Sequence, residues 1–267
     1  MSAAMTALVL AAARRGPADP VAAAEGLGHK CLVDLAGRPM LDRVVTALAA
    51  ARHIGRIFVS CEDPGLIDAL PGGRTLAADG RLACVPAGPT LTDSVKAAAA
   101  AVCEPFPLLV TTGDNALHTP QIIDDFCAQS LASGADVTLG MTPAATLLAA
   151  YPDGARAFHR LADGAWSSCN IYALMTPEAL ATAQVFAGGG QFGKRPRRIL
   201  AAFGLTALIL YRFRLASLDA LMARLGRRFG LAIAALRLDY AEAAIDVDNV
   251  SDLALTRKIL AERCAQP

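Results

Sequence analysis

The sequence predicts an α/β fold in which a mostly parallel central sheet is flanked by helices, with a second, helical lobe inserted late in the chain. Short apolar segments alternate with segments of helical periodicity over residues 6–142, which is the pattern of βαβ units. Several of the apolar segments stop abruptly in polar residues, as buried parallel strands do. The chain has 267 residues, 54% of them hydrophobic, which is enough for one domain with a substantial core.

The first half of the chain is expected to hold five strands with helices between them. Residues 6–12 form the first strand, and a loop follows that runs to Lys30. Pro39 suits the first turn of a helix, and Thr92 and Thr119 can each cap a later helix. The remaining strands are expected at residues 56–60, 82–86, 106–110 and 136–142.

The pattern changes after residue 142, where glycines and mixed charges interrupt the alternation. We predict one domain, with a nucleotide-binding core at 1–145, an acceptor lobe at 146–240 and a closing strand and helix at 241–267. The elements expected in its second half are strands at 168–174, 234–240 and 243–248, a helix from Thr176-Pro177, amphipathic helices at 197–211 and 217–229, and a last helix capped by Ser251.

Composition excludes several classes of protein. The formal net charge is +1 and the charges are scattered, so no nucleic-acid partner is predicted. The apolar start of the chain lacks a basic region and a cleavage signature, and we interpret it as a strand rather than a signal peptide. No apolar run approaches the roughly 20 residues of a membrane span. Seven widely spaced cysteines predict reduced core thiols and a cytoplasmic protein.

Carboxylates follow two of the predicted strands. Asp114 comes directly after the strand at 106–110, and Asp246 and Asp248 alternate at the end of a late strand. If those strands are neighbours, the acids converge where open α/β sheets bind ligands, and Mg²⁺ prefers one or two carboxylates with phosphates and waters. The alternatives are a turn or capping role for Asp114 and a capping role for Asp248.

The loop after the first strand carries three cations, Arg14, Arg15 and Lys30. Backbone N–H groups after a strand can hold phosphate oxygens, so these cations either neutralise a bound anion or are solvated. No P-loop, G-x-S-x-G, H-E-x-x-H or G-x-G-x-x-G motif occurs in a suitable context. His29 and His118 have no companion at metal-ligand spacing, and we interpret both as incidental.

Basic residues cluster in the second lobe, at 194–198 and at Arg224, Arg227 and Arg228. An amphipathic helical pair with solvated arginines would explain them. Two other interpretations remain open: the lobe closes over the phosphate of an acceptor, or residues 194–230 make a peripheral contact with an anionic membrane.

The order and spacing of five segments resemble the MobA-like NTP transferase family of nucleotidyltransferases. The resemblance covers residues 5–142 well and residues 165–175 and 243–260 in outline. It implies a Rossmann-like, GT-A-type fold. The segments are Leu8-Val-Leu-Ala-Ala-Ala13, Lys30, Ala36-Gly-Arg-Pro-Met40, Thr112-Gly-Asp-Asn115 and Ile245-Asp-Val-Asp248.

The resemblance assigns roles to residues of this chain. Lys30 matches the lysine that neutralises the triphosphate, with Arg14 or Arg15 as the family arginine. Asp114 and Asp248 match the two metal ligands. The alternation of Asp246 with Asp248 separately indicates that one of these two binds the metal directly and the other through water, or that one only orients the loop. Asn170 resembles an asparagine that contacts the acceptor. The nucleotide-binding positions are Leu10, Ala11, Ala12, Ala13, Pro86, Gly88, Ser94 and Gly113. Ala13 departs from the family pattern, which has glycine there.

The implied reaction is Mg²⁺-dependent transfer of a nucleotidyl group from a nucleoside triphosphate, with CTP first and GTP or UTP next, to a small phosphorylated acceptor. One alternative is a glycosyltransferase of the same fold, which would need Asp-x-Asp where this chain has Gly113-Asp114-Asn115. Another is a nucleotide-binding protein without turnover, suggested by Ala13. The acceptor, the base and the oligomeric state are left open.

Overall fold

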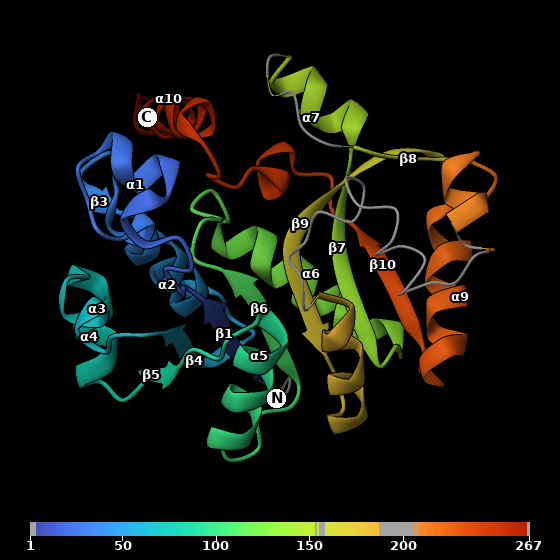
Figure 1. The fold of residues 1–267 in the computed structure, drawn as a ribbon, viewed down its shortest axis with the longest axis horizontal. Helices are drawn as coiled ribbons and strands as arrows, with labels where there is room; N and C mark the ends of the chain where they lie inside the picture. Colours follow the sequence, from blue (N-terminus) through green and yellow to red (C-terminus); the bar gives the residue numbers. More distant parts are fainter. Residues whose placement is uncertain (1–3, 153, 155–157, 187–205, 207, 266–267) are drawn as a thin grey trace.

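A mixed sheet of eight strands crosses the molecule and carries helices on both faces (Figure 1). The computed structural model describes residues 4–152, 154, 158–186, 206 and 208–265. Seven strands follow the order β10-β7-β9-β6-β1-β4-β5, and β8 pairs with β9. The strands are β1 (Met5–Leu10), β4 (Ile54–Cys61), β5 (Leu82–Pro86), β6 (Leu108–Thr112), β7 (Val137–Pro143), β8 (His159–Leu161), β9 (Gly164–Leu174) and β10 (Ile233–Arg237).

Parallel pairing dominates this sheet, as the sequence predicts. β1 pairs in parallel with both β4 and β6, β4 with β5, and β7 with β10. Only β9, within the central path, runs against its neighbours β6 and β7. The described helices and 3-10 helices are α1 (Pro20–Ala24), α2 (Met40–Ala50), α3 (Gly65–Asp68), α4 (Pro71–Ala78), α5 (Leu91–Ala101), α6 (Pro120–Ser133), α7 (Ala144–Ala150), α9 (Leu218–Phe229), α10 (Val250–Ala265), η1 (Gly16–Ala18), η2 (Lys30–Leu32), η3 (Pro177–Phe186) and η5 (Ala241–Ala244).

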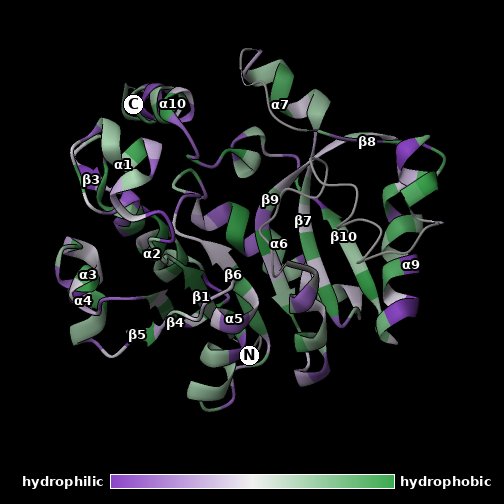
Figure 2. Ribbon diagram, in the orientation of Figure 1, coloured by the Kyte–Doolittle hydropathy of each residue, from purple (hydrophilic) through white to green (hydrophobic). Residues whose placement is uncertain are grey.

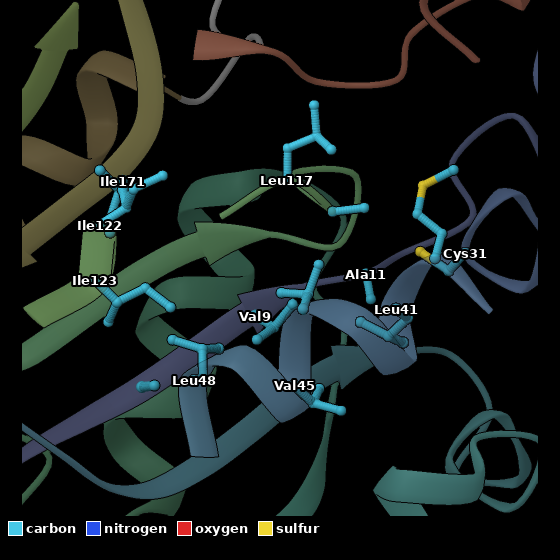
Figure 3. Packing of buried hydrophobic residues seen from close by; sticks show 14 of the residues in the cluster. Val9, Ala11, Cys31, Leu41, Val45, Leu48, Leu117, Ile122, Ile123 and Ile171 are labelled. Atoms are coloured by element: carbon cyan, nitrogen blue, oxygen red, sulfur yellow. The ribbon is translucent and has the colours of Figure 1, made fainter. Parts of the chain in front are cut away.

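Side-chain alternation along β1 explains why both faces of the sheet are covered. Met5, Ala7 and Val9 point to the face that packs against α2 and α6, whereas Leu8 points to the opposite face and packs with α5 and η3. Figure 3 shows Val9 surrounded by side chains of these helices. Hydrophobic colour is concentrated on the central strands, and α9 carries both colours (Figure 2).

Two helix caps decide where the helices before and after β6 begin. Thr119 caps α6 by accepting from the Ile122 N–H at 3.3 Å, as predicted. The prediction that Thr92 caps the preceding helix is wrong. Thr90 is the cap, because Asp93 lies three residues later and completes a capping box, while the Thr92 hydroxyl is buried and donates to the Ala183 carbonyl at 2.6 Å.

The last part of the chain also differs from its prediction. Residues 243–248 are not a strand: η5 is followed by an irregular segment that crosses the strand ends, where the Val247 N–H donates to the Asp114 carbonyl at 3.2 Å. Asn249, rather than Ser251, caps α10, since its side chain accepts from the Asp252 N–H at 3.0 Å.

Strands from the predicted acceptor lobe join the same sheet as β1, because β9 and β10 both come from residues 146–240. The expected helix at 176–177 begins at Pro177 but is the 3-10 helix η3. The second amphipathic helix is α9, which Ser217 caps. Most of the helix expected at 197–211 and the basic segment 194–198 lie outside the described residues. Among the described helices, none has the length and apolar character needed to cross a membrane.

Candidate active site

Lys30 lies between two carboxylates that come from distant parts of the chain. Its Nζ is 2.7 Å from Oδ2 of Asp114 and 3.5 Å from Oδ1 of Asp248. Lys30 begins η2, Asp114 follows β6, and Asp248 precedes α10. The acids therefore converge as expected, although a crossing segment rather than a neighbouring strand brings Asp248 there.

The Asp114 carboxylate is held on both oxygens. Its Oδ1 accepts from the Thr112 hydroxyl at 2.5 Å and from the Asn115 amide at 3.3 Å, which leaves Oδ2 for Lys30. Asn115 itself is 1% exposed. Thr112 and Asn115 were not assigned a role from the sequence, although their position on either side of Gly113-Asp114 was a usable signal. Fixed hydrogen bonds of this kind orient a carboxylate before any ligand binds.

Gly113 lets the carboxylate loop approach the first strand. Its N–H donates to the Leu10 carbonyl at 3.0 Å. A Cβ at this position would lie 2.9 Å from Sγ of Cys31 and 3.3 Å from Cβ of Ala11, so a larger residue would push the loop away. Figure 3 shows Ala11, Cys31 and Leu41 packed beneath this loop.

Negative charge exceeds positive charge at the site. Burial raises the pKa of Asp248, and the nearby Asp246 and Asp114 carboxylates raise it further, while Lys30 opposes them. Burial acts to lower the pKa of Lys30, but the charge and hydrogen bond of Asp114 outweigh it and raise that pKa above its ordinary value. One ammonium group therefore faces three carboxylates, and the site favours a further cation.

Asn170 and Asp246 form a second polar pair beside this cluster. The Asn170 amide donates to Oδ2 of Asp246 at 3.0 Å. Asn170 has φ +50° in the middle of β9, where the register with β7 shifts between Leu139 and Met141. This irregularity has the features of a β-bulge, which re-aims a side chain. The structure therefore brings Asn170 to the carboxylates.

The first loop is arranged differently from an open phosphate nest. The Ala11 N–H donates to the Ser60 carbonyl at 2.9 Å, and the Ala13 N–H donates to the Glu62 carboxylate at 3.0 Å. Ala12 is half-buried, and Arg14 and Arg15 are exposed. Within the described part of the chain, the side chain of neither arginine forms an ion pair or hydrogen bond. Their roles, like those of Leu10 to Ala13, stay predictions.

The segment expected to border the base is held by its own side chains. The Gly88 N–H donates to the buried Ser94 hydroxyl at 2.9 Å. A Cβ on Gly88 would lie 2.5 Å from Cβ of Asp93, so this close packing requires glycine. Pro86 is exposed at the end of β5. Ser94 thus fixes the loop, and its predicted contact with a nucleotide remains to be tested.

The donor set around Lys30 fits a magnesium ion held by two carboxylates. Oδ2 of Asp114 and Oδ1 of Asp248 both face the place that the Lys30 ammonium occupies, so a bound metal would take over these oxygens and leave the ammonium for phosphate. Mg²⁺ takes few protein ligands and completes its shell with phosphates and waters. A cage of three or more His, Cys, Asp or Glu side chains is not found among the described residues, so phosphate or water would have to supply the other ligands.

Comparison with solved structures gives neighbours over almost the whole chain. A hypothetical transferase from Thermus thermophilus is 27% identical with a TM-score of 0.71, covering 94% of this chain and 99% of its own. A CMP:2-keto-3-deoxy-manno-octonic acid synthetase complexed with CTP is 16% identical with a TM-score of 0.58, covering 98% and 100%. The 4-diphosphocytidyl-2C-methyl-D-erythritol synthase from Anaerococcus prevotii is 12% identical with a TM-score of 0.58, with the same coverage.

The last two likenesses establish the Rossmann-like fold alone, because their identities are low. A search of curated proteins finds none that matches the chain. The model of the MobA-like NTP transferase domain matches residues 7–184, which span β1 to η3 and contain Lys30, Asp114 and Asn170. The chain is a nucleotidyltransferase and belongs to the MobA-like NTP transferase family.

Proposed function

We propose that the protein transfers a nucleoside monophosphate from an Mg²⁺-bound nucleoside triphosphate to a small phosphorylated acceptor and releases pyrophosphate. The observation that carries this proposal is the contact of the Lys30 ammonium with both Asp114 and Asp248 at the strand ends. Two carboxylates that can hold a metal, beside an ammonium group that can neutralise phosphate charge, are what a metal-bound triphosphate needs, because phosphoryl transfer depends mainly on positioning and charge neutralisation.

The reaction needs no nucleophilic side chain. A phosphate oxygen of the acceptor attacks the α-phosphorus, the new P–O bond forms, and the bond to the β-phosphate oxygen breaks with its electron pair leaving on pyrophosphate. Bound Mg²⁺, on Asp114 and Asp248 with Asp246 nearby, would neutralise developing charge on the phosphates. Lys30 binds the triphosphate, and Arg14 or Arg15 adds a second cation. Asn170 orients the acceptor.

CTP is the proposed nucleotide, ahead of GTP and UTP. Two structural neighbours have cytidine nucleotides in their names, and one of them was solved with CTP. The segment from Pro86 to Ser94 offers mostly backbone groups to a base, since the Ser94 hydroxyl accepts from Gly88. We place the enzyme in the cytoplasm, because all seven cysteines are free thiols.

Pyrophosphate release from a panel of nucleoside triphosphates and phosphorylated alcohols or sugars tests the proposal. Release that requires both Mg²⁺ and an acceptor supports it. Transfer of sugar from a nucleotide sugar would instead support the glycosyltransferase alternative. Binding of a nucleotide without turnover on any acceptor would support the non-catalytic alternative, which the engagement of the Ala13 N–H by Glu62 favours.

The role of residues 194–230 stays a proposal with two versions. Phe213 and Leu215 are each 65% exposed, and Arg212 and Arg214 are exposed beside them, which suits contact with an anionic membrane. Failure to sediment with anionic vesicles would exclude that version. Unchanged acceptor selectivity after deletion of residues 190–230 would exclude closure over the acceptor.

A further inference from the structure

We propose that His118 is a positioning residue that fastens together the two segments carrying the site's carboxylates. The segments are the loop after β6, with Asp114, and residues 243–248, with Asp246 and Asp248. The consequence for catalysis rests on the proposed function, whereas the fastening itself is a property of the folded chain.

The contacts of His118 connect these segments directly. The side chain is almost fully buried, at 5% exposure, and its Nε2 is 3.0 Å from the Ala243 carbonyl oxygen. A residue four positions after Asp114 therefore reaches the segment that ends in Asp246 and Asp248.

The protonation state of the His118 ring suits a permanent hydrogen bond. Burial lowers the pKa of His118, and hydrogen bonding to the backbone carbonyl of Ala243 opposes this shift only in part. The imidazole is then neutral at pH 7 and carries one N–H. We assign that hydrogen to Nε2, because a carbonyl oxygen can only accept. A buried carbonyl that lost this donor would be left unsatisfied.

Residues 243–248 have a second attachment to the same loop. The Val247 N–H donates to the Asp114 carbonyl at 3.2 Å. Two bonds, at Ala243 and at Val247, thus bracket Asp246 and connect the segment to residues 114–118. This segment has no strand ladder to hold it, so these two bonds, with the hydrogen bond from Asn170 to Asp246, hold Asp248 near Lys30 and Asp114.

Three variants separate positioning from general stability. His118→Leu removes the donor. His118→Gln keeps an N–H donor near the place of Nε2. Ser130→Ala is the matched control, because it deletes another buried side-chain hydrogen bond, the 2.7 Å contact of Ser130 with Thr138, outside the segments that carry the carboxylates. Circular dichroism first establishes that each variant is folded.

Hydrogen exchange of the peptide covering residues 241–249 is the primary measurement, and Mn²⁺ binding followed by electron paramagnetic resonance is the second. We expect His118→Leu to speed exchange of this peptide and to weaken Mn²⁺ binding about tenfold, as loss of an outer partner of a metal site does. His118→Gln should restore most of the exchange protection and most of the Mn²⁺ affinity. Ser130→Ala should change neither the exchange of this peptide nor the Mn²⁺ affinity. Protection equal to wild type in a folded His118→Leu would overturn the proposal.

Failure of the proposed function is distinguishable from failure of this inference. If the wild-type protein released no pyrophosphate with any acceptor, the exchange measurement would still decide the role of His118. Equal acceleration of exchange throughout the sheet in His118→Leu, or an identical local effect of Ser130→Ala, would show a merely structural residue and would also overturn the proposal.

Discussion

Two cationic regions lie close to the same strand ends, and they differ in how they are held. The Lys30 side chain is 18% exposed and contacts two carboxylates. Arg14 and Arg15 are exposed and, within the residues that the structure describes, contact no acid. A paired and partly buried cation is preorganised, whereas a solvated one becomes ordered only when an anion binds. Lys30 should therefore serve the chemical step, and the arginines should serve binding.

The largest loss of activity is expected for a change at Asp114, the acid closest to Lys30. Asp114→Asn keeps the shape of the side chain but removes the charge that pairs with Lys30 and that we propose binds the metal. We expect kcat to fall about 10³-fold with an unchanged circular dichroism spectrum. Asp239→Asn is the control, because Asp239 is exposed and pairs only with the exposed Arg237 among the described residues. Full activity in Asp114→Asn would refute the metal assignment.

Removing Lys30 should cost both turnover and stability. Lys30→Ala leaves the carboxylates of Asp114 and Asp248 without their shared cation, so we expect kcat/KM to fall about 10²-fold and the free energy of unfolding to fall by about 2 kcal/mol. Steady-state kinetics and urea denaturation measure the two losses. A normal kcat in Lys30→Ala would contradict the assignment of Lys30 to the chemical step and of the arginines to binding.

Removing both arginines should affect binding alone. For Arg14→Ala with Arg15→Ala we expect KM for the nucleotide to rise about tenfold, kcat to change little, and unfolding free energy to stay within about 0.5 kcal/mol of wild type. Added salt should raise KM more in the wild-type protein than in this variant. The control is Arg74→Ala on α4, where an exposed basic residue is removed outside the segments assigned to the nucleotide or the acceptor. A fall in kcat with constant KM would contradict the assignment.

The smallest expected effect is the change of unfolding free energy with pH. Lys30 stays charged well above neutrality, so the pH dependence of stability near pH 6 comes from other groups. Burial lowers the pKa of both His118 and His159 in the folded protein. The unfolded chain therefore binds protons first, and stability falls as pH drops below about 6.5 toward the folded pKa values. We expect a slope of at most about 1.4 kcal/mol per pH unit for each histidine, measured by denaturation at several pH values. His118→Gln should flatten this slope, and an unchanged slope would contradict it.

Local patterns were sufficient to predict most of the sheet and the centre of the site. β5, α6 and the parallel pairing follow from short apolar runs, turn residues and caps, which act over a few residues. Asp114 and Lys30 were found because a carboxylate after a buried strand and a lysine after a loop are visible in the sequence. Their 2.7 Å contact with each other was not predicted, because the sequence assigned Lys30 to the triphosphate and Asp114 to the metal.

The features that the sequence did not reveal depend on contacts between distant residues. Nothing local distinguishes β9 as the antiparallel strand between β6 and β7, because strand direction is set by how the chain returns to the sheet. Residues 243–248 alternate like a strand, yet they bind Asp114 rather than a ladder. His118 had no motif around it, and its partner Ala243 is 125 residues away. Such pairings carry no sequence signal in a single chain.

The joining of Lys30 to Asp248 has a consequence for the order of events during synthesis. These residues are 218 positions apart, and every strand of the sheet lies between them or just before Lys30. Domains generally gain structure from the N-terminal side as the chain emerges. A nascent chain can thus form the core around β1, β4 and β6 before residues 243–248 are available. The contact between Lys30 and Asp248 is therefore expected to form after the strand that precedes Asp114 is already in place.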